Sequence, residues 1–278
     1  MKKYIITADD YGMCKEVDDA IEQLAKKGIL STTNVLTNFG TDFSKTAIKK
    51  SDKFSVGIHW NVTTGRPVSD PDKVKTLVDS NGMFHSIDEF RKRFRKRLIN
   101  LDELKLELDN QYDIFYKYFG TADYWNTHEN SSLYPREFNF FEKTALEKNI
   151  KATRNFQRVY IDYDLCKGLK RRLREFMVST FVNIRFGVLA KKKFKMPDGR
   201  IVTFKNISKT DIDRMKKGLN KTNKEIIEII IHPATSGDNP IFGNITTDRV
   251  TEYEKYMTDE FYDLFENHDS KIISYNYL

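Results

Sequence analysis

The chain has 278 residues, of which 39% are hydrophobic and 31% are charged, so it is long enough to bury a core and polar enough to cover it. No apolar run approaches the about 20 residues that a membrane-spanning helix needs, and we therefore expect no membrane segment and a cytoplasmic location. The net charge is +7 at pH 7, but the basic runs at residues 91–97 and 170–174 lack a nucleic-acid-binding motif, so we expect solvated helix faces and no nucleic-acid partner.

The first expected strand ends in two adjacent acids. Residues 4–8 form an apolar run that is followed directly by Asp9 and Asp10. Two neighbouring carboxylates repel each other, so such a pair usually serves a bound cation or a proton transfer. Apolar residues at helical spacing then predict a helix over residues 16–27, which Gly28 ends.

Strands and helices alternate along the rest of the chain. We expect further strands over residues 29–36, 54–59, 123–127, 150–155, 225–231 and 271–275. Turn residues over 63–82 predict a long loop, and an apolar stripe over 104–119 predicts a helix that begins at Asn100 or Asp102. This alternation predicts an α/β fold in which helices cover a largely parallel sheet, and we expect a single domain over residues 1–278.

The segment over residues 167–205 has a less regular pattern. We expect a helix there, followed by a hairpin, because Pro197, Asp198 and Gly199 are typical turn residues. They stand shortly before an apolar, β-branched run at residues 201–204, which we expect to form one arm of the hairpin.

Three of the five histidines, His59, His128 and His232, close strand-like runs. The ends of parallel strands meet at one edge of a sheet, and neutral imidazole together with carboxylate binds Zn²⁺ or a similar divalent ion. We therefore expect Asp10, His59 and His128 to bind one metal ion, with water in the remaining position. A hydrogen-bonded structural role is the alternative for each histidine.

Asp9 and His232 are the candidate acid–base residues. Successive strand residues point to opposite faces, so Asp9 is not expected to share an ion with Asp10 and is free to act as a general base. Its alternative role is to cap a helix that begins after Gly12. His232 precedes Pro233, which restricts its backbone to extended conformations. We expect His232 to donate a proton to a leaving group, or to be a simple hydrogen-bonded histidine.

Seven short segments share their order and spacing with the motifs of a known family. They are residues 7–12 (TADDYG), 28–33 (GILSTT), 57–67 (GIHWNVTTGRP), 126–128 (NTH), 133–135 (LYP), 231–234 (IHPA) and 273–275 (ISY). Together they resemble the motifs of the YdjC-like carbohydrate deacetylases, which include chitooligosaccharide deacetylases. The resemblance spans essentially the whole chain.

This resemblance implies a distorted TIM-like (β/α) barrel of the polysaccharide-deacetylase type. It implies one divalent metal ion, Mg²⁺ or Zn²⁺, bound by Asp10, His59 and His128. The implied reaction removes the N-acetyl group from an acetylated amino sugar or short chitooligosaccharide by means of a metal-activated water. The family segment carries additional histidines after the last ligand, whereas Asn130 and Ser132 stand in those places here.

Three further residues are candidates for contact with the sugar. Tyr11 and Trp60 can stack on a sugar ring, or pack in the core. Arg154 resembles a family arginine near the site, and is expected to bind a substrate oxygen, to orient Asp9, or to form an external salt bridge. Two alternatives to a deacetylase stay open, a metal-dependent phosphoesterase and a catalytically inactive sugar-binding relative. The expected partner is a small-molecule or oligosaccharide substrate, and self-association as a homo-oligomer also stays open.

Overall fold

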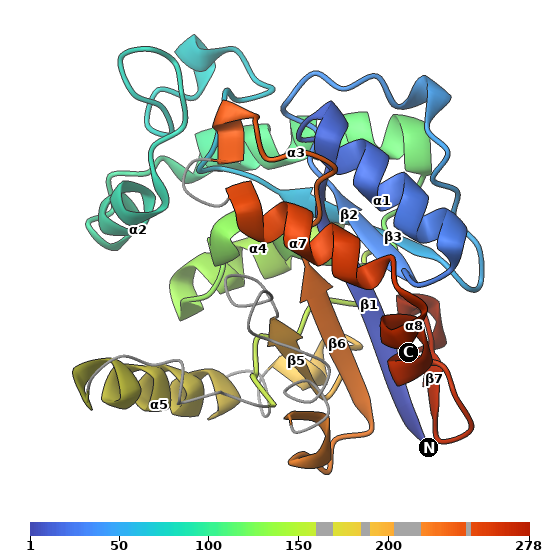
Figure 1. Cartoon of the computed structure of the whole chain (residues 1–278). Coiled ribbons are helices and arrows are strands. Elements are labelled where there is room, and N and C mark those ends of the chain that lie inside the picture. The colour runs from blue at the N-terminus through green and yellow to red at the C-terminus, as the bar shows by residue number, and fades with distance from the viewer. Residues whose placement is uncertain (160–168, 185–189, 203–217, 243–245) are drawn as a thin grey trace.

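The computed structural model describes residues 1–159, 169–184, 190–202, 218–242 and 246–278 (Figure 1). A parallel sheet of seven strands organises them, in the order β4-β3-β2-β1-β6-β5, with β7 paired to the start of β1. The strands are β1 (Lys2–Tyr11), β2 (Thr32–Val35), β3 (Ser55–Trp60), β4 (Trp125–Thr127), β5 (Gly199–Val202), β6 (Ile226–Ile231) and β7 (Ser270–Ile272). Every pairing between these strands is parallel, which confirms the expected α/β fold.

Helices lie outside the curled sheet (Figure 1). They are α1 (Lys15–Lys27), α2 (Ile87–Arg95), α3 (Leu101–Phe119), α4 (Pro135–Glu147), α5 (Leu169–Ile184), α7 (Thr246–Tyr256) and α8 (Asp259–Phe265). Gly28 ends α1 in a left-handed conformation with φ 86°, and Asn100 begins α3 by accepting the Asp102 amide at 2.9 Å, as the sequence predicts. No helix in the described part of the chain is long and apolar enough to cross a membrane.

The central strands are apolar because both faces of the sheet are covered. Ile5 and Ile6 are successive residues of β1 and therefore point to opposite faces, yet both are fully buried. β1 pairs with β6 in continuous register, from Lys3 opposite Ile226 to Ala8 opposite Ile231. This pairing holds the segment before Asp9 in the middle of the sheet.

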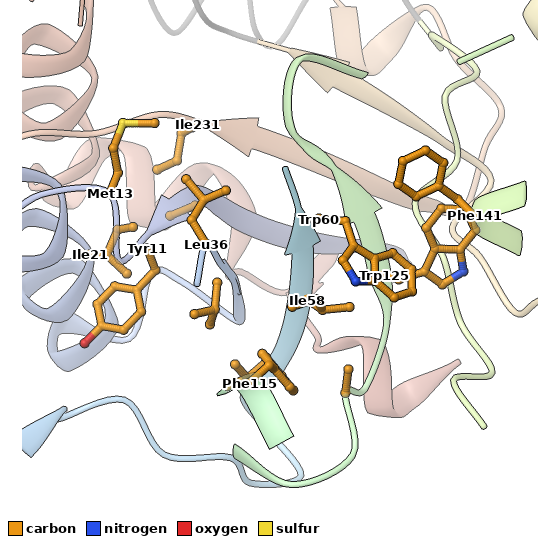
Figure 2. Packing of buried hydrophobic residues seen from close by; sticks show 14 of the residues in the cluster. Tyr11, Met13, Ile21, Leu36, Ile58, Trp60, Phe115, Trp125, Phe141 and Ile231 are labelled. Carbon is orange, nitrogen blue, oxygen red and sulfur yellow. The ribbon is translucent and has the colours of Figure 1, made fainter. Parts of the chain in front are cut away.

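An aromatic cluster supports the two strands that lead to His59 and His128. The ring of Trp60 on β3 lies 5.8 Å from the ring of Trp125 on β4 and 6.0 Å from that of Phe141 on α4, measured between centroids (Figure 2). All three side chains are fully buried. Large aromatic rings contribute much apolar area to a core, so this packing fixes β3 and β4 against α4.

Residues 152–159 close the gap between β4 and β5, the two ends of the strand order. Thr153 forms a single parallel bridge with Trp125 of β4, and Arg158 forms one with Arg200 of β5. The sheet thus curls into a distorted barrel that is completed on one side by isolated bridges instead of a continuous strand.

Two expected elements are wrong. The strand expected over 150–155 does not form, because this segment passes from one neighbouring strand to the other and pairs continuously with neither. The hairpin expected around Gly199 does not form either, since β5 begins at Gly199 and pairs parallel with β6. A Cβ atom on Gly199 would lie 2.9 Å from the Gln157 carbonyl oxygen, so this glycine permits a close approach of two segments. Thr203 and Phe204, also expected in the hairpin, lie outside the described residues.

Candidate active site

Three candidate metal ligands meet at the carboxyl ends of the strands. Asp10 lies near the end of β1, His59 near the end of β3, and His128 directly after β4. Their ligand atoms all lie within 4.8 Å of one another. Asp10 Oδ1 is 3.0 Å from His128 Nδ1 and 3.4 Å from His59 Nε2. Atoms that bind one ion at about 2.0–2.3 Å lie roughly 3 to 4 Å apart, so the three side chains fit a shared divalent ion.

The end of β1 that carries both aspartates is distorted. The register between β1 and β2 shifts between Ala8 and Tyr11, and Asp10 has a left-handed φ of 75°. A regular strand would send Asp9 and Asp10 to opposite faces, but here both contact histidines at the barrel mouth. Among the described residues, the cluster of candidate ligands contains Asp10 without Asp9, and the two acids contact different histidines. A left-handed aspartate costs about 1–3 kcal/mol, and such strain is typical of functional sites.

Asp9 is held by two side chains. Arg154 binds it with two parallel hydrogen bonds, from Nη1 to Oδ2 at 2.7 Å and from Nη2 to Oδ1 at 2.6 Å. Asn34 Nδ2 donates a third, to Oδ1 at 2.6 Å. Burial favours the neutral acid, but the Arg154 guanidinium outweighs it and holds the pKa of Asp9 below its usual range. Asp9 is therefore a carboxylate at neutral pH.

Arg154 has its donors occupied by carboxylates. Besides its bonds to Asp9, its Nε lies 3.1 Å from Glu228 Oε1, and that oxygen also accepts the Thr7 hydroxyl at 2.8 Å. Arg154 is buried, which excludes an external salt bridge. Of the expected roles, this geometry favours the one in which Arg154 orients Asp9.

Asp10 uses its two oxygens differently. Oδ1 faces the two histidines, whereas Oδ2 accepts a hydrogen bond of 2.8 Å from Arg249 Nη2 on α7. Burial favours the neutral acid, but His128 and Arg249 hold the pKa of Asp10 well below its usual value. The Asp10 carboxylate is thus ionised, and its hydrogen bond to Arg249 orients Oδ1 toward the candidate metal site.

The tautomer of His59 depends on Asn126. His59 Nδ1 lies 2.5 Å from Asn126 Oδ1, and in this orientation the ring carries its proton on Nδ1 and leaves Nε2 free to bind a metal. In the reverse orientation the amide nitrogen donates to His59, and its oxygen accepts from Arg154 at 3.0 Å and from Asn34 at 2.9 Å. A metal ion bound at Nε2 would require the first arrangement, because only that arrangement frees Nε2.

His232 lies directly after β6 and faces Asp9. Its Nε2 is 3.7 Å from Asp9 Oδ2, and its side chain is 20% exposed. Glu252 Oε2 accepts the His232 amide at 2.6 Å, which fixes the backbone at this point. Burial lowers the pKa of His232 to about 4 against the opposing effect of Asp9 and Asp10, so the imidazole is neutral at neutral pH.

Tyr11 and Trp60 lie in the core and not beside the site. The Tyr11 hydroxyl bonds to Glu22 and Thr46, each at 2.6 Å, and the Trp60 indole donates to the Leu108 carbonyl at 3.1 Å. Figure 2 shows both rings among buried apolar side chains. The alternative of core packing is therefore correct for both residues, and the expected stacking on a sugar is wrong.

Four polar residues around the site were not expected, namely Asn34, Asn126, Glu228 and Arg249. Glu228 is a polar position inside an otherwise apolar strand, and Asn34 is a polar position in a buried strand; a polar residue in a buried strand usually signals a specific partner. Asn126 lies within the segment that leads to His128. Arg249 has no comparable signal, because it lies in a helix that carries other charged residues.

Comparison with known proteins identifies the family of the chain. The family described as YdjC-like protein matches residues 3–267. A carbohydrate deacetylase from Thermoanaerobacter pseudethanolicus is 27% identical over 156 residues, which cover 54% of this chain and 59% of that protein. A chitooligosaccharide deacetylase from Yersinia enterocolitica is 29% identical over 155 residues, which cover 54% of this chain and 58% of that protein. The chain thus matches less than two thirds of the length of these relatives.

A solved structure shares the fold across the whole chain. It comes from Enterococcus faecalis V583, is described provisionally as a cellobiose-phosphate cleavage protein, and superposes with a TM-score of 0.74. The superposition covers 99% of this chain and 98% of the other, at 20% identity, and so supports the fold alone. Because the family match covers nearly the whole chain, the protein belongs to the YdjC-like protein family.

Proposed function

We propose that the protein is a metal-dependent deacetylase that hydrolyses the N-acetyl group of an acetylated amino sugar or short chitooligosaccharide. The observation that carries the proposal is the convergence of Asp10, His59 and His128 beside a second, separately held carboxylate, Asp9. The relatives named carbohydrate deacetylase and chitooligosaccharide deacetylase support the substrate class.

Asp10, His59 and His128 would hold the metal. Two imidazoles and one carboxylate favour Zn²⁺ over Mg²⁺, because Mg²⁺ prefers an all-oxygen shell. When bound there, the ion supplies the Lewis acidity that polarises the amide carbonyl and lowers the pKa of water.

Asp9 is the proposed general base. It is ionised, and Arg154 and Asn34 fix its orientation, so it can take the proton of the attacking water without first reorganising. The strong pairing with Arg154 lowers the basicity of Asp9, but it also fixes the position of the carboxylate.

His232 is the proposed proton donor to the departing amine. His232 is neutral before the reaction, so it must first receive a proton. Its Nε2 lies 3.7 Å from Oδ2 of Asp9, the proposed base. The proton that Asp9 removes from water can therefore pass to His232 and then to the amine, which restores both residues.

The proposal is tested by measuring acetate and free amine from N-acetylglucosamine oligomers. Protein stripped with a chelator should be inactive, and adding Zn²⁺, Co²⁺, Mn²⁺ or Mg²⁺ separately should show which ion restores equal amounts of the two products. Phosphomonoesters and phosphodiesters serve as the second substrate panel. Phosphate release without acetate release would support the phosphoesterase alternative, and metal binding without any turnover would support a sugar-binding relative.

A further inference from the structure

Helix α5 carries its apolar stripe on the face that points away from the protein. Counted from its first residue, large apolar side chains stand at i, i+4, i+7, i+8 and i+15, and at 3.6 residues per turn these positions fall within an arc of about 100°. They are Leu169, Leu173, Phe176, Met177 and Ile184. Each of the five is more than half exposed, with values between 55% and 82%.

The opposite side of α5 contacts the core. Among the residues of α5 whose side chains the structure describes, only Val182 is buried, and it belongs to the hydrophobic core. At i+13 it lies about half a turn away from the centre of the apolar stripe. An amphipathic helix of a globular protein normally turns its stripe to the core. Here the stripe is turned outward, and Figure 1 shows α5 extending away from the sheet.

A stripe of this kind marks a binding surface. Single exposed apolar residues are common on the surfaces of globular proteins, but a contiguous exposed patch usually marks a site for another protein or for a membrane. Phe181 is 42% exposed and extends the stripe along one side. Whatever covers α5 must therefore offer an apolar environment over several turns of the helix.

The charge of α5 distinguishes between the possible partners. Its sequence holds four basic residues against one acid, which leaves a net charge of +3. They are Lys170, Arg171, Arg172, Arg174 and Glu175. A second copy would bring the same positive charge to the stripe, so charge opposes self-pairing through this helix. A nucleic acid would match the charge but not the leucine and isoleucine side chains. An anionic lipid surface matches both.

We propose that α5 binds the surface of an anionic lipid membrane, where its apolar stripe enters the boundary between headgroups and acyl chains. Helices that combine Phe and Leu on one face with Lys and Arg on the other bind membranes in this way, in the plane of the interface. Lys and Arg also gain from the negative potential of an anionic leaflet.

The length of α5 allows it to lie on a membrane but not to cross one. Its 16 residues span about 24 Å, less than the about 30 Å of the hydrocarbon core. The inference does not depend on the deacetylase function, because none of the residues assigned to the candidate active site lies on α5.

Sedimentation with lipid vesicles tests the proposal. The full chain is mixed with vesicles of equal parts phosphatidylglycerol and phosphatidylcholine, or with vesicles of phosphatidylcholine alone, and the protein in the pellet is measured. At low salt, binding to the anionic vesicles should be at least about tenfold tighter than binding to the neutral ones. Added salt should weaken it, because it screens the attraction between helix and headgroups.

A double variant of the stripe should lose this binding. In Leu173→Ser/Phe176→Ser the apolar area falls, so affinity for the anionic vesicles should fall by about tenfold or more. Leu98→Ser/Leu101→Ser is the matched control, because it removes two leucines that are 51% and 49% exposed outside α5, and its affinity should equal that of wild type. Both variants should melt close to the wild-type temperature, since all four side chains are exposed.

A second measurement leaves the stripe apolar. The two native tryptophans, Trp60 and Trp125, are fully buried, so in Phe176→Trp a change in fluorescence on adding vesicles comes from α5. Anionic vesicles should shift the emission to shorter wavelength, because the indole leaves water for the membrane interface. Leu98→Trp should show no such shift.

The inference is overturned if wild type does not bind the anionic vesicles, if it binds the neutral ones equally well, or if Leu173→Ser/Phe176→Ser binds as wild type does. An unshifted emission of Phe176→Trp overturns it as well, even if the double variant fails to fold. Light scattering of the same proteins identifies the main alternative. A wild-type dimer that dissociates in the double variant, without vesicle binding, would show that a second copy covers the stripe.

Discussion

Each aspartate of the site has an arginine of its own. Two buried carboxylates in neighbouring positions normally raise the pKa of one of them, but here the pKa values of both Asp9 and Asp10 lie below their usual range. Arg154 neutralises Asp9, and Arg249, together with His128, neutralises Asp10. Both side chains are therefore ionised at neutral pH, as a metal ligand and a general base must be.

Substitution to asparagine should separate the two roles. Asp9→Asn removes the proton acceptor and keeps the candidate ligands, so kcat should fall by about 10²- to 10⁴-fold with little change in metal affinity. Asp10→Asn replaces an anionic candidate ligand by a neutral, weaker one, so metal affinity should fall as well. Acetate release measures the first effect, and calorimetric titration with Zn²⁺ the second. Equal loss of metal from both variants would contradict the assignment.

His232 should make the free energy of unfolding depend on pH. Its folded pKa of about 4 lies below the about 6.5 of an unfolded histidine, so the unfolded chain binds the proton first. This contribution is complete above about pH 6.5 and is lost as the pH falls toward about 4. In metal-free protein, His232→Gln should therefore lose less stability than wild type over that window, as measured by urea unfolding. His268→Gln changes a histidine whose side chain is 87% exposed and serves as the control.

Elements that depend on a local residue pattern could be predicted from the sequence, whereas elements that depend on distant contacts could not. Mainly apolar runs predicted β3 and β6, and the N-cap residue Asn100 with the apolar stripe predicted α3. The bridges of residues 152–159 depend on β4 and β5 at once, and no local pattern encodes that. The left-handed conformation of Asp10 could not be predicted from the sequence either. The core position of Trp60 could have been predicted, because successive strand residues point to opposite faces and His59 faces the site.

Gly12 should be essential to the distorted end of β1. It has a φ of 93°, and a Cβ atom there would lie 2.5 Å from the Leu36 carbonyl oxygen and 2.6 Å from Phe43 Cζ. Gly12→Ala should therefore destabilise the fold by about 1–2 kcal/mol for the backbone and by about 1–3 kcal/mol more for the clash. Gly40→Ala is the control, because Gly40 has a φ of 76° but nothing within 4 Å of its Cβ position. The difference between the two variants in the free energy of unfolding, measured with urea, gives the cost of the clash. An equal loss of stability in both variants would show that the close contacts at Gly12 do not matter.

At the scale of the whole molecule, the site joins parts of the chain that are far apart in sequence. Asp10, His59 and His128 come from β1, β3 and the turn after β4, and His232 follows β6. The barrel brings them together because all of these strands run in the same direction and end at one edge. The candidate ligands could be selected from the sequence as strand-end acids and histidines, whereas the pairing of Asp10 with Arg249 required the folded barrel.

A bound ion should therefore stabilise the whole fold. At about 100 times its dissociation constant, a metal that binds only the folded state adds about 2.7 kcal/mol to the free energy of unfolding. We expect Zn²⁺ to raise the melting temperature of the stripped protein by roughly 5–10 °C and a chelator to reverse the change. His128→Ala should melt at the same temperature with and without Zn²⁺. A shift of wild-type size in that variant would place the ion elsewhere.

The pairing of β1 with β6 has a consequence for how the protein is made. Lys3 pairs with Ile226, so at about 5–20 residues per second a ribosome releases β1 roughly 10 to 45 s before its partner. During that interval an apolar strand destined for the middle of the sheet has an open edge, which is a template for aggregation. Slower synthesis at low temperature lengthens the interval during which β1 is unpaired, whereas a chaperone that binds the nascent strand shields its open edge. Soluble yield should therefore respond more to chaperone supply than to cooling.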